Sequence, residues 1–210
     1  ENYGKKFYGP STLRVGLEKS RNLMTIRIAQ NLGLNKIVDF SEQLEIYENP
    51  DELLSISLGS AETTLLKLTT AYAAFVNGGK LVKPILIDRV QDSEGVTIVN
   101  NGMRNCKNCE QISFLSKDFP SIKDNYKQIF SKQTAYQMTS ILEGVIKRGT
   151  GKKLRDLGLN LAGKTGTTNK NTDTWFIGFT SNLVVGVYVG ADNPKPLGKY
   201  ETGSKTALPI

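Results

Sequence analysis

The sequence contains no histidine among its 210 residues. This absence excludes catalysis by Ser-His-Asp or Cys-His groups, and it removes the ligand that many zinc and copper sites use. Any acid–base chemistry must therefore come from lysine, carboxylate, tyrosine or neutral hydroxyl side chains. Long hydrophobic runs are absent as well. The longest is LVVGVYVGA at 183–191, far shorter than the roughly 20 residues that a membrane-spanning helix needs.

Cysteine is also scarce. Cys106 and Cys109 are the only two, and they lie in the polar segment RNCKNCE. A zinc site would need two more ligands at suitable spacing, which the sequence does not offer. A redox-active Cys-x-x-Cys pair would be expected where a helix begins after a strand, whereas this pair lies in a polar segment. We therefore expect a local disulfide or two thiols without function, and no metal site.

The charge balance is basic, with a net charge of +7. The lysines are scattered and do not alternate with aromatic residues in a stripe, so we expect a solvated surface and no nucleic-acid partner. The composition, 39% hydrophobic and 22% charged, is typical of a globular domain. Residues 1–210 are expected to form one domain or one contiguous piece of a domain. Because the first residue is Glu1, we interpret the chain as a processed product or a fragment.

Apolar residues at helical spacing predict four helices. The first is expected to be capped by Ser11, the second to end at Gly33, and the fourth to end at Gly149. The predicted ranges are 9–20, 22–33, 63–79 and 131–149, with a further helical turn in 38–50. A hairpin is expected over 83–99 around a turn at 92–95, followed by a loop to about residue 130. Three β segments are expected at 161–169, 174–180 and 183–190.

The stretch LAGKTGTTN at 161–169 places a lysine among Gly and Thr in a strand-like region. One motif that includes this lysine is the P-loop, because GLNLAGKT, Gly158–Thr165, matches G-x-x-x-x-G-K-[ST] letter for letter. A P-loop must follow a buried strand and begin a helix. The preceding KKLRDL is polar, and the following TGTTNKNTDTW is unfavourable for a helix. A P-loop nucleotide hydrolase therefore stays only as an alternative.

The other motif is Lys164-Thr165-Gly166, which matches the third motif of the penicillin-recognising serine enzymes and requires a strand. An edge strand lets an extended peptide pair with its backbone, and Gly166 lets that peptide approach closely. Lys164 would supply a positive charge for a substrate carboxylate, and Thr165 would add a hydroxyl donor. The backbone N–H of Thr167 would donate to an oxyanion.

The same enzymes use a Ser-x-Asn motif, and EKSRNLM supplies Ser20 and Asn22. Residues two apart on a helix point in different directions, so both reach one site only from a turn. This motif falls at the predicted junction between the first two helices. Ser20 would pass a proton between the site lysine and the leaving amine, and Asn22 would hydrogen-bond the substrate amide carbonyl. If this motif stood alone, the interpretation of Ser20 as an N-cap of the second helix would be favoured.

Over nearly its whole length the sequence resembles the transpeptidase domain of the class A, bifunctional penicillin-binding proteins. The resemblance implies an α/β fold, a mainly antiparallel sheet flanked by helices, of which this chain supplies the C-terminal portion. Residues of about 100–130 would be a loop or insertion within that domain. The stretches that carry the resemblance are KFYGPSTLRVGLEKSRNLMTIRIAQNLG, SLGSAETTLLKLTTAYAAFVNGGK, MTSILEGVIKRGTG, AGKTGTTNKNTDTWFIGFTSNLVVGVYVG and ETGSKTALPI.

The resemblance implies D,D-transpeptidation of peptidoglycan stem peptides through a serine acyl-enzyme, without a cofactor or metal. β-Lactams would mimic the D-Ala-D-Ala dipeptide and trap the acyl-enzyme. The site would face the periplasm or cell exterior. A glycosyltransferase domain and a membrane anchor would lie upstream of this chain.

The family's nucleophile lies in Ser-x-x-Lys, and no serine of this chain is followed by lysine three residues later. The nearest pattern, Thr64-Leu65-Leu66-Lys67, lies in a predicted helix, and we interpret it as packing and solvent face. We therefore expect the nucleophile upstream of Glu1 and expect this chain alone to be inactive. Two further alternatives are a non-catalytic cell-wall-binding module and a β-lactamase, for which we identify no deacylating base.

Overall fold

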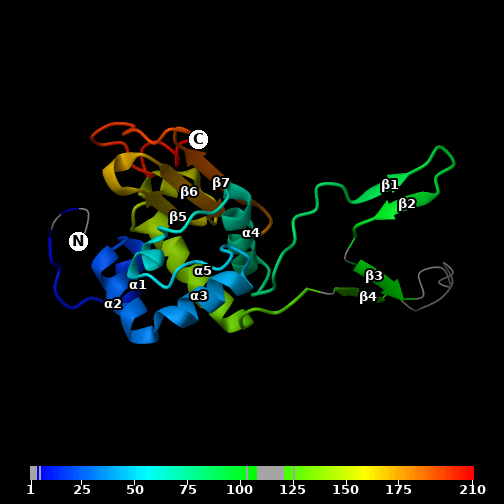
Figure 1. Cartoon of the computed structure of the whole chain (residues 1–210), viewed down its shortest axis with the longest axis horizontal. Coiled ribbons are helices and arrows are strands. Elements are labelled where there is room, and N and C mark those ends of the chain that lie inside the picture. The colour runs from blue at the N-terminus through cyan, green and yellow to red at the C-terminus, as the bar shows by residue number, and fades with distance from the viewer. Residues whose placement is uncertain (1–3, 5, 103, 108–120, 125) are drawn as a thin grey trace.

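The computed structural model describes residues 4, 6–102, 104–107, 121–124 and 126–210. Its centre is a three-stranded antiparallel sheet in the order β5-β6-β7 (Figure 1). The strands are β5 (Ala162–Thr167), β6 (Thr174–Phe179) and β7 (Val184–Val189). The last two are rich in β-branched and aromatic residues, which favour strands. All three predicted β segments are therefore confirmed.

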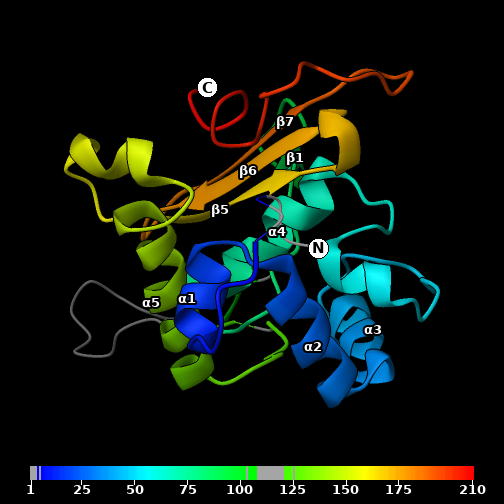
Figure 2. The same ribbon diagram turned by 90° about the vertical axis from the view of Figure 1, so that its left-hand side faces the viewer.

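The two faces of this sheet pack against different parts of the chain. One face packs on helices α4 (Leu65–Val76) and α5 (Lys132–Lys147), and the other carries the C-terminal segment (Figure 2). Ala162 of β5 is buried with Leu142 of α5, whereas Phe176 of β6 packs on Leu208. Because successive strand residues alternate between faces, Lys164 shares the helical face with Ala162, and Thr165 lies on the opposite face.

The remaining helices lie on the side of α5 that faces away from the sheet's C-terminal cover (Figure 2). They are α1 (Leu13–Glu18), α2 (Asn22–Leu32) and α3 (Leu34–Gln43). Three short 3-10 helices lie in the connections: η1 (Leu54–Leu58) before α4, η2 (Lys152–Leu157) between α5 and β5, and η3 (Asn169–Asn171) between β5 and β6. In the described part of the chain, no helix is long and apolar enough to cross a membrane.

Helix ends agree with the predictions in most places and differ in three. Gly33 ends α2 with a φ of 99°, as predicted. The predicted cap at Ser11 is wrong, because Thr12 is the N-cap of α1 and its hydroxyl accepts the Val15 N–H at 3.3 Å. Helix α5 has Arg148 as its C-cap, so Gly149 follows the cap. Helix α3 begins directly after Gly33, four residues before the predicted helical turn at 38.

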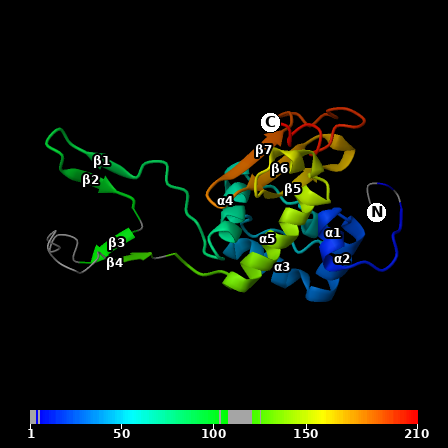
Figure 3. The same cartoon turned by 180° about the vertical axis from the view of Figure 1, so that it is seen from behind.

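The described strands between α4 and α5 lie on an arm that extends away from the body (Figure 1, Figure 3). Strands β1 (Arg89–Gln91) and β2 (Thr97–Asn100) form the predicted hairpin. The prediction of a loop from there to residue 130 is wrong in part, because β3 (Arg104–Lys107) pairs with β4 (Ser121–Asp124). Neither strand has the alternation of apolar and polar residues that marks a strand in a sequence. Cys109 lies outside the described residues, so the predicted disulfide with Cys106 stays a prediction.

Candidate active site

The Lys-Thr-Gly sequence lies in β5, which is an edge strand of the described three-stranded sheet. At its C-terminal end, the Thr168 N–H donates to Asp173 O of the turn to β6, at 3.1 Å. Backbone groups along an antiparallel strand alternate between the partner strand and the other side. Thr165 and Thr167 therefore direct their N–H and C=O groups toward the open edge of the sheet. The predicted edge position is confirmed for the described residues.

Lys164 bridges this edge and the turn between α1 and α2. Its ammonium donates to Ser20 Oγ at 2.8 Å and to the Thr165 carbonyl oxygen at 2.9 Å. Burial lowers the pKa of Lys164 from 10.5 to about 8, because the charged form loses hydration. The lysine thus joins two motifs that are 144 residues apart in the sequence.

Ser20 and Asn22 lie where the sequence predicts, at the junction between two helices. Ser20 has a φ of 52°, which is uncommon for a residue with a side chain, and α2 begins at Asn22. The N-cap of α2 is Arg21, without a side-chain cap bond, so the interpretation of Ser20 as a simple N-cap is wrong. The turn directs the Ser20 hydroxyl to Lys164. Among the described residues, the Asn22 side chain has no hydrogen-bond partner.

The other residues of the Lys-Thr-Gly strand also have partners that the sequence analysis did not anticipate. The hydroxyls of Thr165 and Thr150 share a hydrogen bond of 2.7 Å. The Thr167 hydroxyl accepts the Gly203 N–H at 3.0 Å. A Cβ at Gly166 would lie 3.0 Å from Trp175 Cβ, so this glycine also makes room for the tryptophan.

The sequence did not predict that two of these partners, Thr150 and Gly203, contact the Lys-Thr-Gly strand. Gly203 is buried, and a Cβ there would overlap the backbone oxygens of Gly166 and Trp175. Its segment therefore crosses directly over β5 and β6, which only a glycine permits. The signals available were the small residues of RGTG and ETGS, which alone do not indicate contact with a distant strand.

The geometry of Gly158–Thr165 excludes a P-loop. Lys164 and Thr165 are strand residues, and no α-helix follows them in the described sequence before β6. Helix η3 after the strand has only three residues and a kink at Lys170. Without a helix N-terminus behind the loop, there is no cradle of N–H groups for phosphate.

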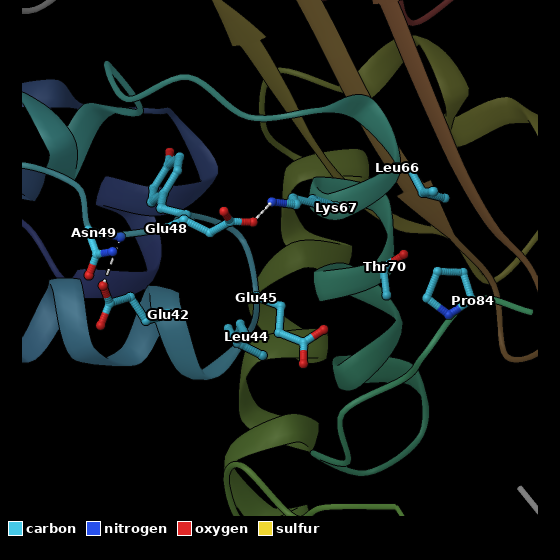
Figure 4. Close-up of a pocket in the computed structure, with 10 residues that line it drawn as sticks. Glu42, Leu44, Glu45, Glu48, Asn49, Leu66, Lys67, Thr70 and Pro84 are labelled. Atoms are coloured by element: carbon cyan, nitrogen blue, oxygen red, sulfur yellow. Dashed lines mark hydrogen bonds and ion pairs between the residues drawn. The ribbon is translucent and has the colours of Figure 1, made fainter.

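The side chains of the Thr64–Lys67 pattern bond to groups other than Lys164 and Ser20. Thr64 is the N-cap of α4 and not an interior residue, and its hydroxyl accepts the Lys67 N–H at 3.2 Å. The Lys67 ammonium lies 2.5 Å from Glu48 and lowers the pKa of that carboxyl. Figure 4 shows this pair at a cavity of about 510 Å³ between the end of α3 and α4. The cavity is lined by Glu42, Leu44, Glu45, Tyr47, Glu48, Asn49, Leu66, Lys67, Thr70 and Pro84.

The fold is that of the penicillin-binding transpeptidases. The chain aligns with the crystal structure of penicillin-binding protein 1A from Haemophilus influenzae at a TM-score of 0.84 and 30% identity, over 100% of this chain and 34% of that chain. Penicillin-binding protein A from M. tuberculosis, solved as an imipenem acyl-enzyme complex, matches at a TM-score of 0.70 and 19% identity, over 97% of this chain and 48% of that chain. The second match supports the fold alone.

Sequence comparison gives the family. The profile of the penicillin binding protein transpeptidase domain matches residues 1–210. Penicillin-binding protein 1A of Rickettsia bellii is 44% identical over 214 residues, and that of Pseudomonas aeruginosa is 34% identical over 243 residues. The chain belongs to the penicillin-binding protein transpeptidase domain family. Both alignments cover the whole chain but only 27% and 29% of these relatives' lengths.

Proposed function

We propose that residues 1–210 are the C-terminal portion of a single transpeptidase domain that cross-links peptidoglycan stem peptides through a serine acyl-enzyme. The observation that carries this proposal is the 2.8 Å hydrogen bond from Lys164 to Ser20, which joins the Lys-Thr-Gly strand to the Ser-x-Asn turn. Family membership supports the reaction class.

In this proposal the D-Ala-D-Ala end of a stem peptide lies along the open edge of β5. The Lys164 ammonium pairs with its terminal carboxylate, and Gly166 leaves room for its backbone. The edge N–H of Thr167 donates to the carbonyl oxygen as negative charge develops there. The Thr165 hydroxyl can donate to the carboxylate while it accepts from the Thr150 hydroxyl, because either oxygen of that bond can be the donor. Asn22, at the start of α2, donates to the substrate amide carbonyl.

The nucleophile is expected in a part of the protein that this chain does not contain, since no serine here has lysine at the third following position. The serine oxygen bonds to the carbonyl carbon of the penultimate D-Ala as the peptide C–N bond breaks. Ser20 passes the proton released by the nucleophilic hydroxyl to the leaving nitrogen, and free D-Ala departs. The amine of a second stem peptide then bonds to the acyl carbon as the acyl C–O bond to the serine breaks. The proton that the amine loses returns to the serine oxygen. With a β-lactam, the lactam C–N bond opens and the product stays attached.

The whole protein would carry this domain outside the cytoplasmic membrane, where peptidoglycan lies. The length of the curated relatives leaves room for the glycosyltransferase domain and membrane anchor that the class A resemblance implies. Reaction with a β-lactam distinguishes the two alternatives of the same fold from a transpeptidase. A β-lactamase would lose the acyl group to water, and a non-catalytic wall-binding module would form no covalent adduct.

A pH series tests the role of Lys164. Because its pKa is about 8, its positive charge is present below that pH and is lost as the pH rises through it. We expect the affinity for a D-Ala-D-Ala-terminated stem peptide to be constant from pH 6 to 7 and to fall about tenfold per unit above pH 8. Calorimetric titration of the full-length protein measures this.

Lys164→Arg is the matched variant, because a guanidinium stays charged throughout this range. It should weaken binding at pH 7 but remove the decline above pH 8. The same decline in both proteins would assign the titration to another group and contradict the role given to Lys164.

A further inference from the structure

Among the residues that the structure describes, the reaction proposed above leaves one buried carboxylate without a role. Glu18 is the last residue of α1, two positions before Ser20, and is only 3% exposed. Its oxygens accept two hydrogen bonds from Arg148, at 2.5 Å from Nη2 and 3.2 Å from Nε. Glu18 raises the pKa of the Arg148 guanidinium through these bonds. Arg14 is a weaker neighbour, at 3.8 Å. A carboxylate so buried needs this pairing, because an unpaired buried charge is strongly destabilising.

The backbone around this pair ties the end of α1 to the end of α5. The Thr150 N–H donates to the Glu18 carbonyl oxygen at 3.2 Å, and Lys19 Nζ donates to the Arg148 carbonyl oxygen. Glycines permit this approach: a Cβ at Gly144 would overlap the Glu18 carboxylate, and one at Gly149 would overlap the Glu18 carbonyl oxygen. The end of α1 is therefore held at its backbone as well as at its side chain.

The residues in these contacts adjoin both the Ser-x-Asn turn and the Lys-Thr-Gly strand. Glu18 is followed directly by the turn that directs Ser20 Oγ to Lys164. On the other side, Thr150 shares its hydroxyl hydrogen bond with Thr165 of the Lys-Thr-Gly strand. The segment at the end of α5 thus contacts the Ser-x-Asn turn and the Lys-Thr-Gly strand at once.

We propose that Glu18 is a positioning residue for the acylation reaction, and that its ion pair with Arg148 sets the position of Ser20 against Lys164. The inference rests on the proposed function. Ser20 has a left-handed backbone conformation, which persists only where surrounding contacts enforce it. The Glu18–Arg148 pair and the Thr150 bond supply those contacts on the N-terminal side of the turn.

The test is Glu18→Gln in the full-length protein, which keeps the shape of the side chain and removes its charge. The expected result is a loss of about 10²-fold in the second-order rate of acylation by benzylpenicillin, the size of effect that a shift of about 1 Å at a reacting group produces. In a Ser20→Ala background, the same change should cost less than about twofold. A merely structural role would lower the rate by similar factors in both backgrounds.

Two further variants complete the test. Lys147→Met removes the neighbouring exposed pair with Glu143, at 2.9 Å on the same helix, and should leave acylation unchanged. Arg148→Lys keeps the positive charge but cannot donate two parallel hydrogen bonds to Glu18, and it replaces Glu18→Gln as the test variant if that protein does not fold. It should slow acylation when Ser20 is present and have little effect in the Ser20→Ala background.

The outcomes separate the two proposals. Wild-type acylation by a folded Glu18→Gln or Arg148→Lys protein, with Ser20→Ala slow, would overturn the positioning role and leave the proposed function intact. An equal loss with and without Ser20 would also overturn it. Wild-type acylation by Ser20→Ala would instead contradict the proposed function itself.

Discussion

Replacing Lys164 with alanine in the full-length protein is expected to lower the second-order rate constant of acylation by benzylpenicillin about 10³-fold. The substitution removes the charge that would pair with the substrate carboxylate and the hydrogen bond to Ser20 Oγ. Losing one preorganised charge-stabilising donor costs about 10²–10³-fold, and losing a proton-transfer partner costs a similar factor. Stopped-flow fluorescence of a labelled penicillin measures the rate.

Lys164→Arg is the control for charge alone. This variant should retain part of the affinity for the carboxylate. Its planar guanidinium does not reproduce the ammonium–hydroxyl hydrogen bond to Ser20. Its acylation rate should therefore lie between those of the wild type and Lys164→Ala. A Lys164→Ala protein that acylates within tenfold of the wild type would refute the assignment of this lysine.

Replacing Ser20 with alanine is expected to slow acylation about 10²–10⁴-fold while leaving noncovalent affinity nearly unchanged. The serine hydroxyl is the proposed proton carrier, and general acid–base groups contribute about this factor to the chemical step and not to binding. Pre-steady-state kinetics separate the two quantities. The double variant Ser20→Ala, Lys164→Ala should lose little more than the worse single variant, because residues that act as a unit are not additive.

Ser57→Ala provides the matched control for removing a serine hydroxyl. Ser57 lies in η1, and its hydroxyl donates to the Leu54 carbonyl oxygen at 2.6 Å and not to Lys164, so its loss should not change the rate. If Ser20→Ala raises the dissociation constant but not the chemical step, Ser20 binds substrate and does not carry the proton.

The parts of this fold that the sequence predicts are those specified by local patterns. Apolar periodicity indicates α2, α4 and α5, and β-rich runs indicate the central strands. The contact between Lys164 and Ser20 could be anticipated because two short motifs with a shared chemistry occur in the order and setting that their reaction needs. The P-loop consensus also matched letter for letter, but the backbone around Lys164 is a strand, and phosphate binding requires a helix.

The remaining features depend on tertiary contacts that no local pattern records. Ser11 and Thr12 are both suitable caps, and only the path of the chain into α1 decides between them. The sequences of β3 and β4, RNCK and SIKD, lack the alternation of apolar and polar residues that predicts a strand. The sequence around Glu18 indicates only a residue near a helix end and not an ion pair, because its partner Arg148 is 130 residues away in the sequence. Gly203 likewise shows its role only where its segment crosses the backbone of β5.

The measurement that tests the account most directly is the intact mass of the protein after treatment with benzylpenicillin. It would be made on the full-length protein and on residues 1–210 alone, with circular dichroism of each to establish folding. We expect one covalent adduct on the full-length protein and none on residues 1–210, because the site described here supplies Lys164 and Ser20 but no Ser-x-x-Lys nucleophile. An adduct on residues 1–210, or none on a folded full-length protein, would contradict the account.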